Sequence, residues 1–366
     1  MNILDKIALT KIKGIGPKLS RTLLAYCGSV DEIFSCSKKQ LMAIPGIGEA
    51  VASTILSKSY LKEAEEEYHF IQKHNIQALW IEDKEYPKRL KNCEDAPLLL
   101  YFKGNTSLNP FRSISIVGTR NATSYGKKIC EEFIREIKDY DVLIISGLAY
   151  GIDGAAHREA LKNHIPTVGV LGHGLDRIYP LAHRDLATKM LDNGGLLTEF
   201  PSGTSPDRQN FPMRNRIIAG LADVTIIVEA ALQGGALITA EIANTYNRDV
   251  CAFPGAIDQH FSAGCNYLIK THRAHLIRNA EDLAYLMNWE KREDRKPLSK
   301  QLPLIPEDMT KDEKKVFDFI RESEQASIDD IALHCDWPQS KLAIVLLEME
   351  MKGILISLPG KTYKLI

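Results

Sequence analysis

Short apolar runs alternate with amphipathic segments through the middle of the chain. Each run has the length of a buried strand, and the segment after it repeats its apolar positions at helical spacing. The runs lie at 113–118, 142–147, 167–172, 196–200, 224–229 and 249–255. Such alternation predicts a parallel sheet covered on both faces. We therefore expect residues 67–287 to form a doubly wound, mostly parallel α/β sheet, with 67–112 as a small extension packed on it.

A repeated hairpin pattern precedes this sheet. The stretches "IKGIGPKLSRTLL" at 12–24 and "IPGIGEAVASTIL" at 44–56 each place Gly-Ile-Gly before an apolar-periodic helix. Glycine accepts positive φ, so each Gly-Ile-Gly predicts a tight turn between two helices. The pair resembles a tandem helix-hairpin-helix module, and we expect residues 1–66 to form a SAM-like helical domain of that kind.

The first hairpin carries local positive charge. No acidic residue occurs between positions 11 and 30, and the basic residues there are Lys11, Lys13, Lys18 and Arg21. Hairpins of this type can aim backbone N–H groups at DNA phosphate, so these four residues are candidates for a secondary DNA contact. The second hairpin has Glu49 beside it. The alternative, that both hairpins only pack helices together, stays open.

The C-terminal end predicts a separate domain. Residues 288–308 mix charge with proline and predict a linker. Residues 309–366 then show three helical segments and two short strands, the order of a winged helix-turn-helix. Positions 310–366 hold eight basic and ten acidic residues, and the third helix carries Glu348 and Glu350. Because such a surface repels phosphate, we expect protein contact or packing from this domain instead of duplex recognition.

Length and composition limit the number of domains and the kinds of ligand site that the chain can have. A chain of 366 residues predicts two or three domains, and its formal net charge of −1 means that any anion site must come from a local cluster. No window approaches the ~18 apolar residues of a membrane span, and the N-terminus lacks a signal-peptide core. The seven cysteines show no C-x-x-C spacing. We therefore expect reduced thiols in a cytoplasmic protein.

Basic residues gather in the loops that follow the predicted strands. In doubly wound sheets, ligands bind beyond the carboxyl ends of the strands, where glycines and helix N-termini expose backbone N–H groups. The arginines expected at this edge are Arg120, Arg184, Arg208, Arg214 and Arg216. Their convergence beside glycine-rich loops predicts an extended anion site. The alternative for Arg214 and Arg216 is an internal ion pair with Glu199 or Glu229.

Nucleotide cofactors and metals are not expected. The glycines after the first strand do not follow G-x-G-x-x-G, and no G-x-x-x-x-G-K-[ST] sequence occurs. Asp153 and His157 share a helix face but lack a third ligand. Cys265, His272 and His275 are spaced too loosely for a structural zinc site. A capping aspartate and a partly buried histidine are the expected roles of the first pair.

Six blocks of the central segment resemble one known family in order and spacing. They are "SIVGTRNATSYG", "ISGLAYGIDGAAHREAL", "VLGHGLDRIYP", "FPMRNRIIAGLADVTIIVEA", "LITAEIA" and "RDVCAFPG". The chain is similar to the DprA/Smf family, the DNA-processing proteins of natural transformation, from about Tyr86 to Arg278. The resemblance implies a Rossmann-like domain that binds single-stranded DNA and dimerises. It also implies protection of incoming strands, loading of the recombinase RecA, and no catalytic turnover.

The resemblance also assigns roles to residues. The loop with Gly118, Thr119 and Arg120 would contact phosphate, as would Arg214 and Arg216, while Asn215 would shape the turn. Phe211 would stack a base, with core packing as its alternative. Gly147 and Gly151 would let the DNA strand lie close to the backbone, and Arg184 would add a further cation. The family's S-G-S-L-I-T-A is Gly234-Gly235-Ala236-Leu237-Ile238-Thr239-Ala240 here, so phosphate contact there would need backbone N–H groups or Thr239.

An enzymatic alternative rests on one loop. The stretch "GGALITAE" at 234–241 partly resembles the G-G-x-G-T-x-x-E loop of Lonely Guy–type nucleotide phosphoribohydrolases, and Glu241 would then be a catalytic carboxylate. Leu237 and Ile238 replace the glycine and threonine of that loop. These side chains indicate helix packing, so we expect a DNA-binding protein and not this enzyme.

Overall fold

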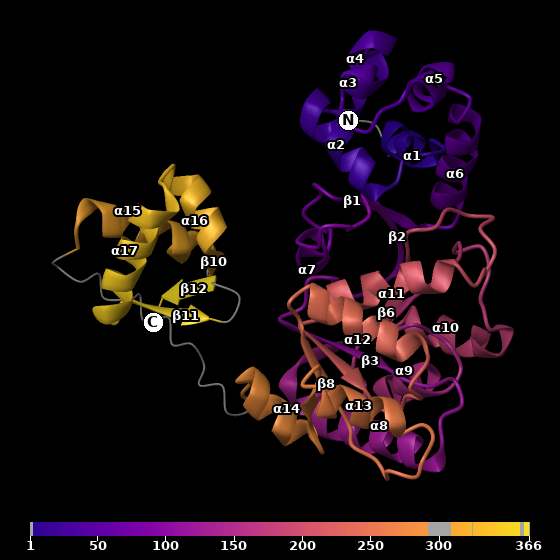
Figure 1. Ribbon diagram of the computed structural model, residues 1–366, viewed down its shortest axis with the longest axis vertical. Helices are drawn as coiled ribbons and strands as arrows, with labels where there is room; N and C mark the ends of the chain where they lie inside the picture. The colour runs from indigo at the N-terminus through magenta and orange to yellow at the C-terminus, as the bar shows by residue number, and fades with distance from the viewer. Residues whose placement is uncertain (1–2, 292–308, 324, 359–361, 366) are drawn as a thin grey trace. The chain divides into compact units, whose positions relative to one another are not determined.

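The computed structural model describes residues 3–291, 309–323, 325–358 and 362–365. The chain forms two compact units, Met1–Asp294 and Arg295–Ile366 (Figure 1). The first unit contains both the predicted helical domain and the predicted sheet. Most of the predicted linker at 288–308 lies outside the described residues.

The N-terminal segment is a pair of hairpins packed on each other, as the repeat predicts. Its helices are α1 (Ile3–Lys11), α2 (Pro17–Cys27), α3 (Val30–Ser35), α4 (Lys38–Met42), α5 (Glu49–Ser57) and α6 (Leu61–Lys73). Gly14 and Gly46 turn the two hairpins with φ of +86° and +85°, a conformation that side chains disfavour. A Cβ on Gly14 would lie 3.5 Å from Val51, and one on Gly46 would lie 3.1 Å from Leu19. Each turn therefore packs against the helix that follows the other turn.

A nine-stranded sheet dominates residues 3–291 and confirms the predicted fold. Its strands are β1 (Gln77–Trp80), β2 (Leu99–Gly104), β3 (Arg112–Val117), β4 (Val142–Ser146), β5 (Thr167–Val170), β6 (Gly194–Thr198), β7 (Val224–Ile227), β8 (Asp249–Ala252) and β9 (His275–Leu276). Their order is β1-β2-β6-β5-β4-β3-β7-β8-β9. Pairing is parallel from β6 to β9, whereas β1 and β2 form an antiparallel edge from the predicted extension. The order reverses between β3 and β7, which is where doubly wound folds bind ligands.

Helices cover both faces of the sheet (Figure 1). They are α7 (Lys88–Lys91), α8 (Ser124–Ile137), α9 (Ile152–Lys162), α10 (Arg184–Met190), α11 (Asn210–Leu221), α12 (Gly235–Thr245), α13 (Ala263–Lys270) and α14 (Ala280–Met287), with 3₁₀ turns at Lys138–Tyr140 and Leu181–His183. Side chains of strand β3 alternate between the two faces of the sheet and contact different helices on each face. Ile114 and Ile116 pack with α8 residues in one apolar core. Ser113 and Ser115 alternate with them and donate hydroxyl hydrogen bonds of 2.9 and 2.6 Å to carbonyls of α11.

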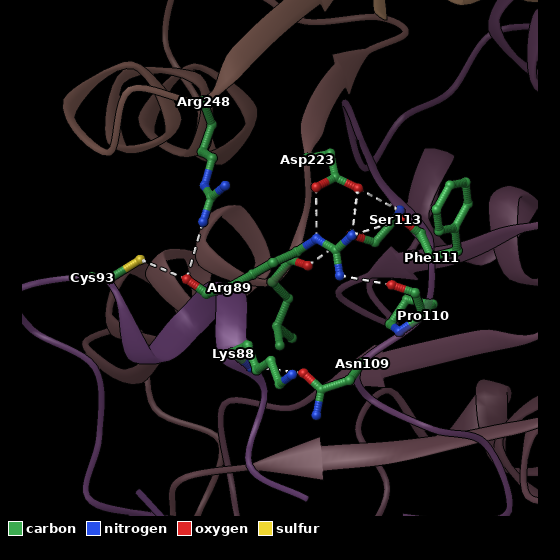
Figure 2. A network of polar contacts seen from close by, with 10 residues as sticks. Lys88, Arg89, Cys93, Asn109, Pro110, Phe111, Ser113, Asp223 and Arg248 are labelled. Carbon is green, nitrogen blue, oxygen red and sulfur yellow. Dashed lines mark hydrogen bonds and ion pairs between the residues drawn. The ribbon is translucent and has the colours of Figure 1, made fainter. Parts of the chain in front are cut away.

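An ion pair ties the extension to the amino ends of β3 and β7 (Figure 2). Arg89 donates from Nε and Nη2 to the carboxylate of Asp223 over 2.6 and 2.9 Å, and its guanidinium also donates to the carbonyls of Pro110 and Phe111. Asp223 also accepts from the backbone N–H of Ser113 at 2.8 Å. This network lies at the end of the sheet opposite to the predicted anion site, so it is structural.

The C-terminal unit is a winged helix, as predicted. Its elements are α15 (Lys311–Ser323), β10 (Ala326–Ser327), α16 (Ile328–Cys335), α17 (Gln339–Met351), β11 (Leu355–Leu358) and β12 (Thr362–Leu365), and the sheet order is β10-β12-β11. Phe317, Ile331 and Leu346 belong to a core of its own. Glu348 and Glu350 are exposed on α17. In neither unit does a described helix combine the length and the apolarity needed to cross a membrane.

Candidate nucleic-acid interface

The loop after β3 is fixed by its neighbours at the carboxyl edge of the sheet. The Thr119 N–H donates to the Glu229 carbonyl at 2.7 Å, and the Ile152 N–H donates to the Thr119 carbonyl at 3.2 Å. The Glu229 carboxylate accepts from the N–H and the hydroxyl of Thr123 over 2.9 and 2.6 Å. Glu229 therefore holds the loop that carries Arg120, and it is not the arginine partner considered from the sequence.

The space around three glycines at this edge is filled by other atoms of the chain. A Cβ on Gly147 would lie 1.6 Å from the Arg214 guanidinium, and one on Gly151 would lie 2.1 Å from the Thr119 carbonyl. Gly151 also has a φ of +77°. A Cβ on Gly118 would overlap Ile152 at 2.5 Å. Internal packing thus explains these glycines, while close approach of DNA to Gly147 and Gly151 stays a prediction.

Arg214 is buried beneath the edge. Helix α11 begins at Asn210, so Arg214, Asn215 and Arg216 lie within a helix and not in the predicted turn. The Arg214 side chain is 4% exposed and donates to the Val170 carbonyl at 3.2 Å, beside Asp153. Burial lowers its pKa to about 10. The prediction that Arg214 contacts phosphate is therefore corrected, because its guanidinium is buried and donates to a backbone carbonyl within the protein.

Arg216 also points inward. Its guanidinium donates to the Glu199 carboxylate and to the Asp95 carbonyl, and both members of the Arg216–Glu199 pair are about nine-tenths buried. Burial raises the pKa of Glu199, and the charge of Arg216 opposes that rise. The internal pair is thus the correct alternative, and the predicted phosphate contact of Arg216 is wrong in this arrangement. Asn215 donates to the Gly235 carbonyl at 3.3 Å and joins α11 to α12.

Arg120 is exposed and lines an open hollow. This cationic hollow has a volume of about 570 Å³ and is formed by Arg120, Asn121, Ala122, Lys127, Tyr150, Gly151, Arg158 and His183. Three of its residues are cations, and none is an acid. Within the described ranges, Arg120, Lys127 and Arg158 have no carboxylate within ion-pair distance. Uncompensated positive charge around a recess attracts a polyanion.

The ring of Phe211 supports this cluster from α11. Its centroid lies 5.4 Å from the Arg120 guanidinium carbon, 6.0 Å from that of Arg214 and 6.0 Å from the Tyr179 ring. Phe211 is half-buried. A cation over an aromatic face is attracted by the ring. Phe211 therefore orients Arg120, while its predicted stacking on a base stays a prediction.

The other predicted cations divide into two groups. Arg184 is exposed and directly follows the hollow residue His183. Arg208 is exposed in a turn, three residues before Phe211. In the helical segment, Lys11 pairs with the buried Glu67 at 3.5 Å and Lys18 with Glu94 at 3.4 Å. Arg21 donates to the Lys91 carbonyl at 3.3 Å, and Lys13 is exposed. Lys11 and Arg21 are thus engaged within the chain, which favours the packing alternative for them.

The segment at 234–241 forms the start of α12 and not a loop, and it offers little polar chemistry. The Thr239 hydroxyl donates to the Gly235 carbonyl at 2.9 Å inside α12, so it is not presented to a ligand. Leu237 packs against the core, as its sequence context indicates, whereas Ile238 is 44% exposed. Glu241 accepts from Arg273 at 2.7 Å.

Acid should weaken the fold through His157. Its ring is buried with Nδ1 at 2.7 Å from the Thr167 hydroxyl, and burial lowers its pKa from 6.5 to about 3. The unfolded chain therefore binds the proton more tightly, so this stability is present above pH 6.5 and is lost as the pH falls toward 3. We expect His157 alone to lower the unfolding free energy by up to about 1.4 kcal/mol per pH unit across that window.

Denaturant unfolding at about pH 7 and about pH 5 measures this loss. A His157→Gln variant cannot titrate, so its stability should differ less between the two pH values. Equal pH dependence in parent and variant would show that His157 is not the responsible group.

Four residues of this interface escape prediction from the sequence. Lys127 and Arg158 belong to helices α8 and α9, and Tyr150 and Tyr179 belong to loops after β4 and β5. Tyr150, Arg158 and Tyr179 lie inside the sequence blocks already noted, and Lys127 directly follows the first block. The signal that could have found them is position, because each follows the last residue of a strand by 12 residues or fewer.

The fold and this edge define a class: a Rossmann-like protein with a cation-lined carboxyl edge, preceded in the chain by helical hairpins and followed in the chain by a winged helix. The sequence model of DNA recombination-mediator protein A matches residues 77–288. A SAM-like helix-hairpin-helix tandem matches 6–58, and the DprA winged helix domain matches 300–361. The chain belongs to the DprA/Smf family.

Individual relatives are similar to this chain over more than half of its length. Protein Smf of Synechocystis is 30% identical over 98% of this chain and 97% of its own length. The DNA processing protein DprA of Bacillus subtilis is 41% identical over 57% of this chain and 70% of its own. The crystal structure of DprA from Streptococcus pneumoniae superposes with a TM-score of 0.70 at 33% identity, covering 79% of this chain and 99% of that one. A Helicobacter pylori DprA structure, described for its single-stranded DNA binding mode, gives 0.53 at 28% identity over 59% and 97%.

Proposed function

We propose that the protein binds single-stranded DNA at the carboxyl edge of its sheet and acts as a recombination mediator. In this proposal it is a cytoplasmic homodimer that protects incoming strands and loads RecA during natural transformation and homologous recombination. The observation that carries the proposal is the cationic hollow, where Arg120, Lys127 and Arg158 face solvent without a carboxylate in the lining. The single-strand binding of the Helicobacter pylori relative supports the choice of ligand.

The chemistry of the hollow suits a phosphate backbone. Each cation that neutralises a phosphate releases condensed counterions, so binding should be largely independent of sequence and should weaken with salt. Arg120 is already held over Phe211 and by the loop contacts of Thr119, so little ordering remains to be done on binding. No step in this role requires bond making or breaking, and we propose a non-catalytic protein without a cofactor.

The enzymatic alternative gains no support from Glu241. A phosphoribohydrolase would need this carboxylate free for the reaction, but it is paired with Arg273. Incubation with nucleoside monophosphates tests the point. Release of free base at an enzyme-like rate would favour the alternative over DNA binding.

The mediator role is tested with RecA on strands coated by a single-strand-binding protein. We expect the protein to shorten the lag of RecA filament formation and to slow exonuclease digestion of the strand. Binding of the strand without either effect would limit the function to DNA binding.

Removing residues 309–366 should leave single-strand affinity nearly unchanged. The winged helix has its own core, and its third helix exposes Glu348 and Glu350 toward solvent. Independent sites contribute additively, so we expect a change of less than about twofold. Anisotropy titration of the truncated chain measures it, and loss of binding would place the DNA surface on the winged helix.

A further inference from the structure

Two exposed tyrosines stand beside the cationic hollow without a role in the fold. Tyr150 is 49% exposed and Tyr179 is 47% exposed. Among the described residues, neither hydroxyl makes a hydrogen bond. Tyr125 is exposed to the same 47%, yet its hydroxyl donates to the Pro254 carbonyl at 2.7 Å. Exposed rings with free hydroxyls contribute little to stability, so their presence here calls for another explanation.

Both rings are connected to Arg120. Tyr150 lines the hollow with Arg120, and its ring meets the edge of the buried His183 at a centroid distance of 5.4 Å. Tyr179 lies 6.0 Å from Phe211, whose ring in turn lies 5.4 Å from the Arg120 guanidinium. The loops follow β4, which neighbours β3 in the sheet, and β5, which neighbours β4. Aromatic side chains are thus interleaved with cations along one edge.

Phe211 is less suited to receive a base than either tyrosine. Two guanidinium groups already lie near its ring, and a Cβ on Gly172 would lie only 3.0 Å from it. The ring is therefore packed against its neighbours on more than one side. Tyr150 and Tyr179 offer the more open aromatic faces at this edge.

Resting on the proposed single-strand function, we infer that Tyr150 and Tyr179 are two stacking subsites for unpaired bases, placed where Arg120 holds the phosphate between them in the bound strand. Stacking accepts every base because each has a π-face. A base inside a duplex is already stacked and paired. The two tyrosines would therefore supply the preference for single strands that cations alone cannot give.

The test distinguishes binding through the bases from binding through the phosphates. Its probes are an oligothymidylate of about 20 nucleotides, longer than typical site sizes, and an abasic oligomer with the same number of phosphates. Tyr150→Ala and Tyr179→Ala should each weaken oligothymidylate binding by about 5- to 150-fold. Affinity for the abasic oligomer should stay at the parent value. Tyr150→Phe and Tyr179→Phe should bind both probes as the parent does, because no hydrogen bond is lost.

Tyr285→Ala is the matched control, since this tyrosine is 91% exposed on α14. It should change neither affinity. Alanine variants that bind oligothymidylate as the parent does, or that lose both probes equally, would overturn the stacking subsites while leaving the proposed function intact. A parent that binds neither probe would instead remove the proposed function itself.

Discussion

Replacing Arg120 with alanine is expected to weaken binding of single-stranded DNA by about 10- to 100-fold. A charge-assisted hydrogen bond to phosphate contributes about 1.5–3 kcal/mol, and each 1.4 kcal/mol is tenfold in affinity. Arg120 is the cation that joins the hollow to the Phe211–Tyr179 pair. The salt dependence should also fall, by a slope of about 0.7 for one lost phosphate contact on a single strand. Fluorescence anisotropy over a salt series measures both quantities.

The fold should survive this change, because Arg120 is exposed and has no carboxylate partner among the described residues. A thermal unfolding curve checks that point. Arg278→Ala is a matched control, since Arg278 is 71% exposed and pairs with Asp282 within one helical turn. It should bind as the parent does. Parent-like affinity in Arg120→Ala would remove the hollow from the DNA surface.

Replacing Arg216 with alanine is expected to lower the unfolding free energy by about 3–5 kcal/mol. The substitution leaves Glu199 buried without its partner, and an uncompensated buried charge is strongly destabilising. The carbonyl of Asp95 also loses its donor. Chemical denaturation followed by circular dichroism measures the loss, and DNA affinity is then determined under conditions where the variant is folded.

The double variant Arg216→Met with Glu199→Leu separates structure from binding. It removes both charges and keeps apolar volume, so it should recover much of the lost stability. Its single-strand affinity should match the parent. A single Arg216→Ala variant with parent-like stability and reduced DNA affinity would restore the phosphate contact first predicted from the sequence.

Periodicity was sufficient to predict the architecture. Apolar runs located the parallel strands, the Gly-Ile-Gly repeat located both hairpins, and the helix order located the winged helix. These features are local, because the residues that determine a strand or a turn are neighbours in the sequence. The antiparallel edge formed by β1 and β2 could not be predicted in this way, because β2 joins the sheet through β6, which lies far away in sequence.

The sequence indicated which edge of the sheet gathers basic side chains, but not which of these side chains stay exposed there. The sequence puts Arg214 and Arg216 near the carboxyl edge, yet it does not say that α11 begins at Asn210 and turns both toward the interior. The partner Glu199 follows a different strand. Conversely, Lys127 and Arg158 reach the hollow from helices. Side-chain direction follows from helix phase and tertiary packing, which a count of basic residues in loops does not contain.

The central claim is that the carboxyl edge holds the backbone and the bases of a flexible strand. Parallel titrations of single-stranded and double-stranded oligonucleotides over a salt series, with light scattering for the oligomeric state, test it most directly. The account predicts tighter binding of the single strand at every salt concentration, a steep decrease of that affinity with salt, and loss of it in Arg120→Ala. Equal affinity for duplex and single strand, unchanged in Arg120→Ala, would contradict the account.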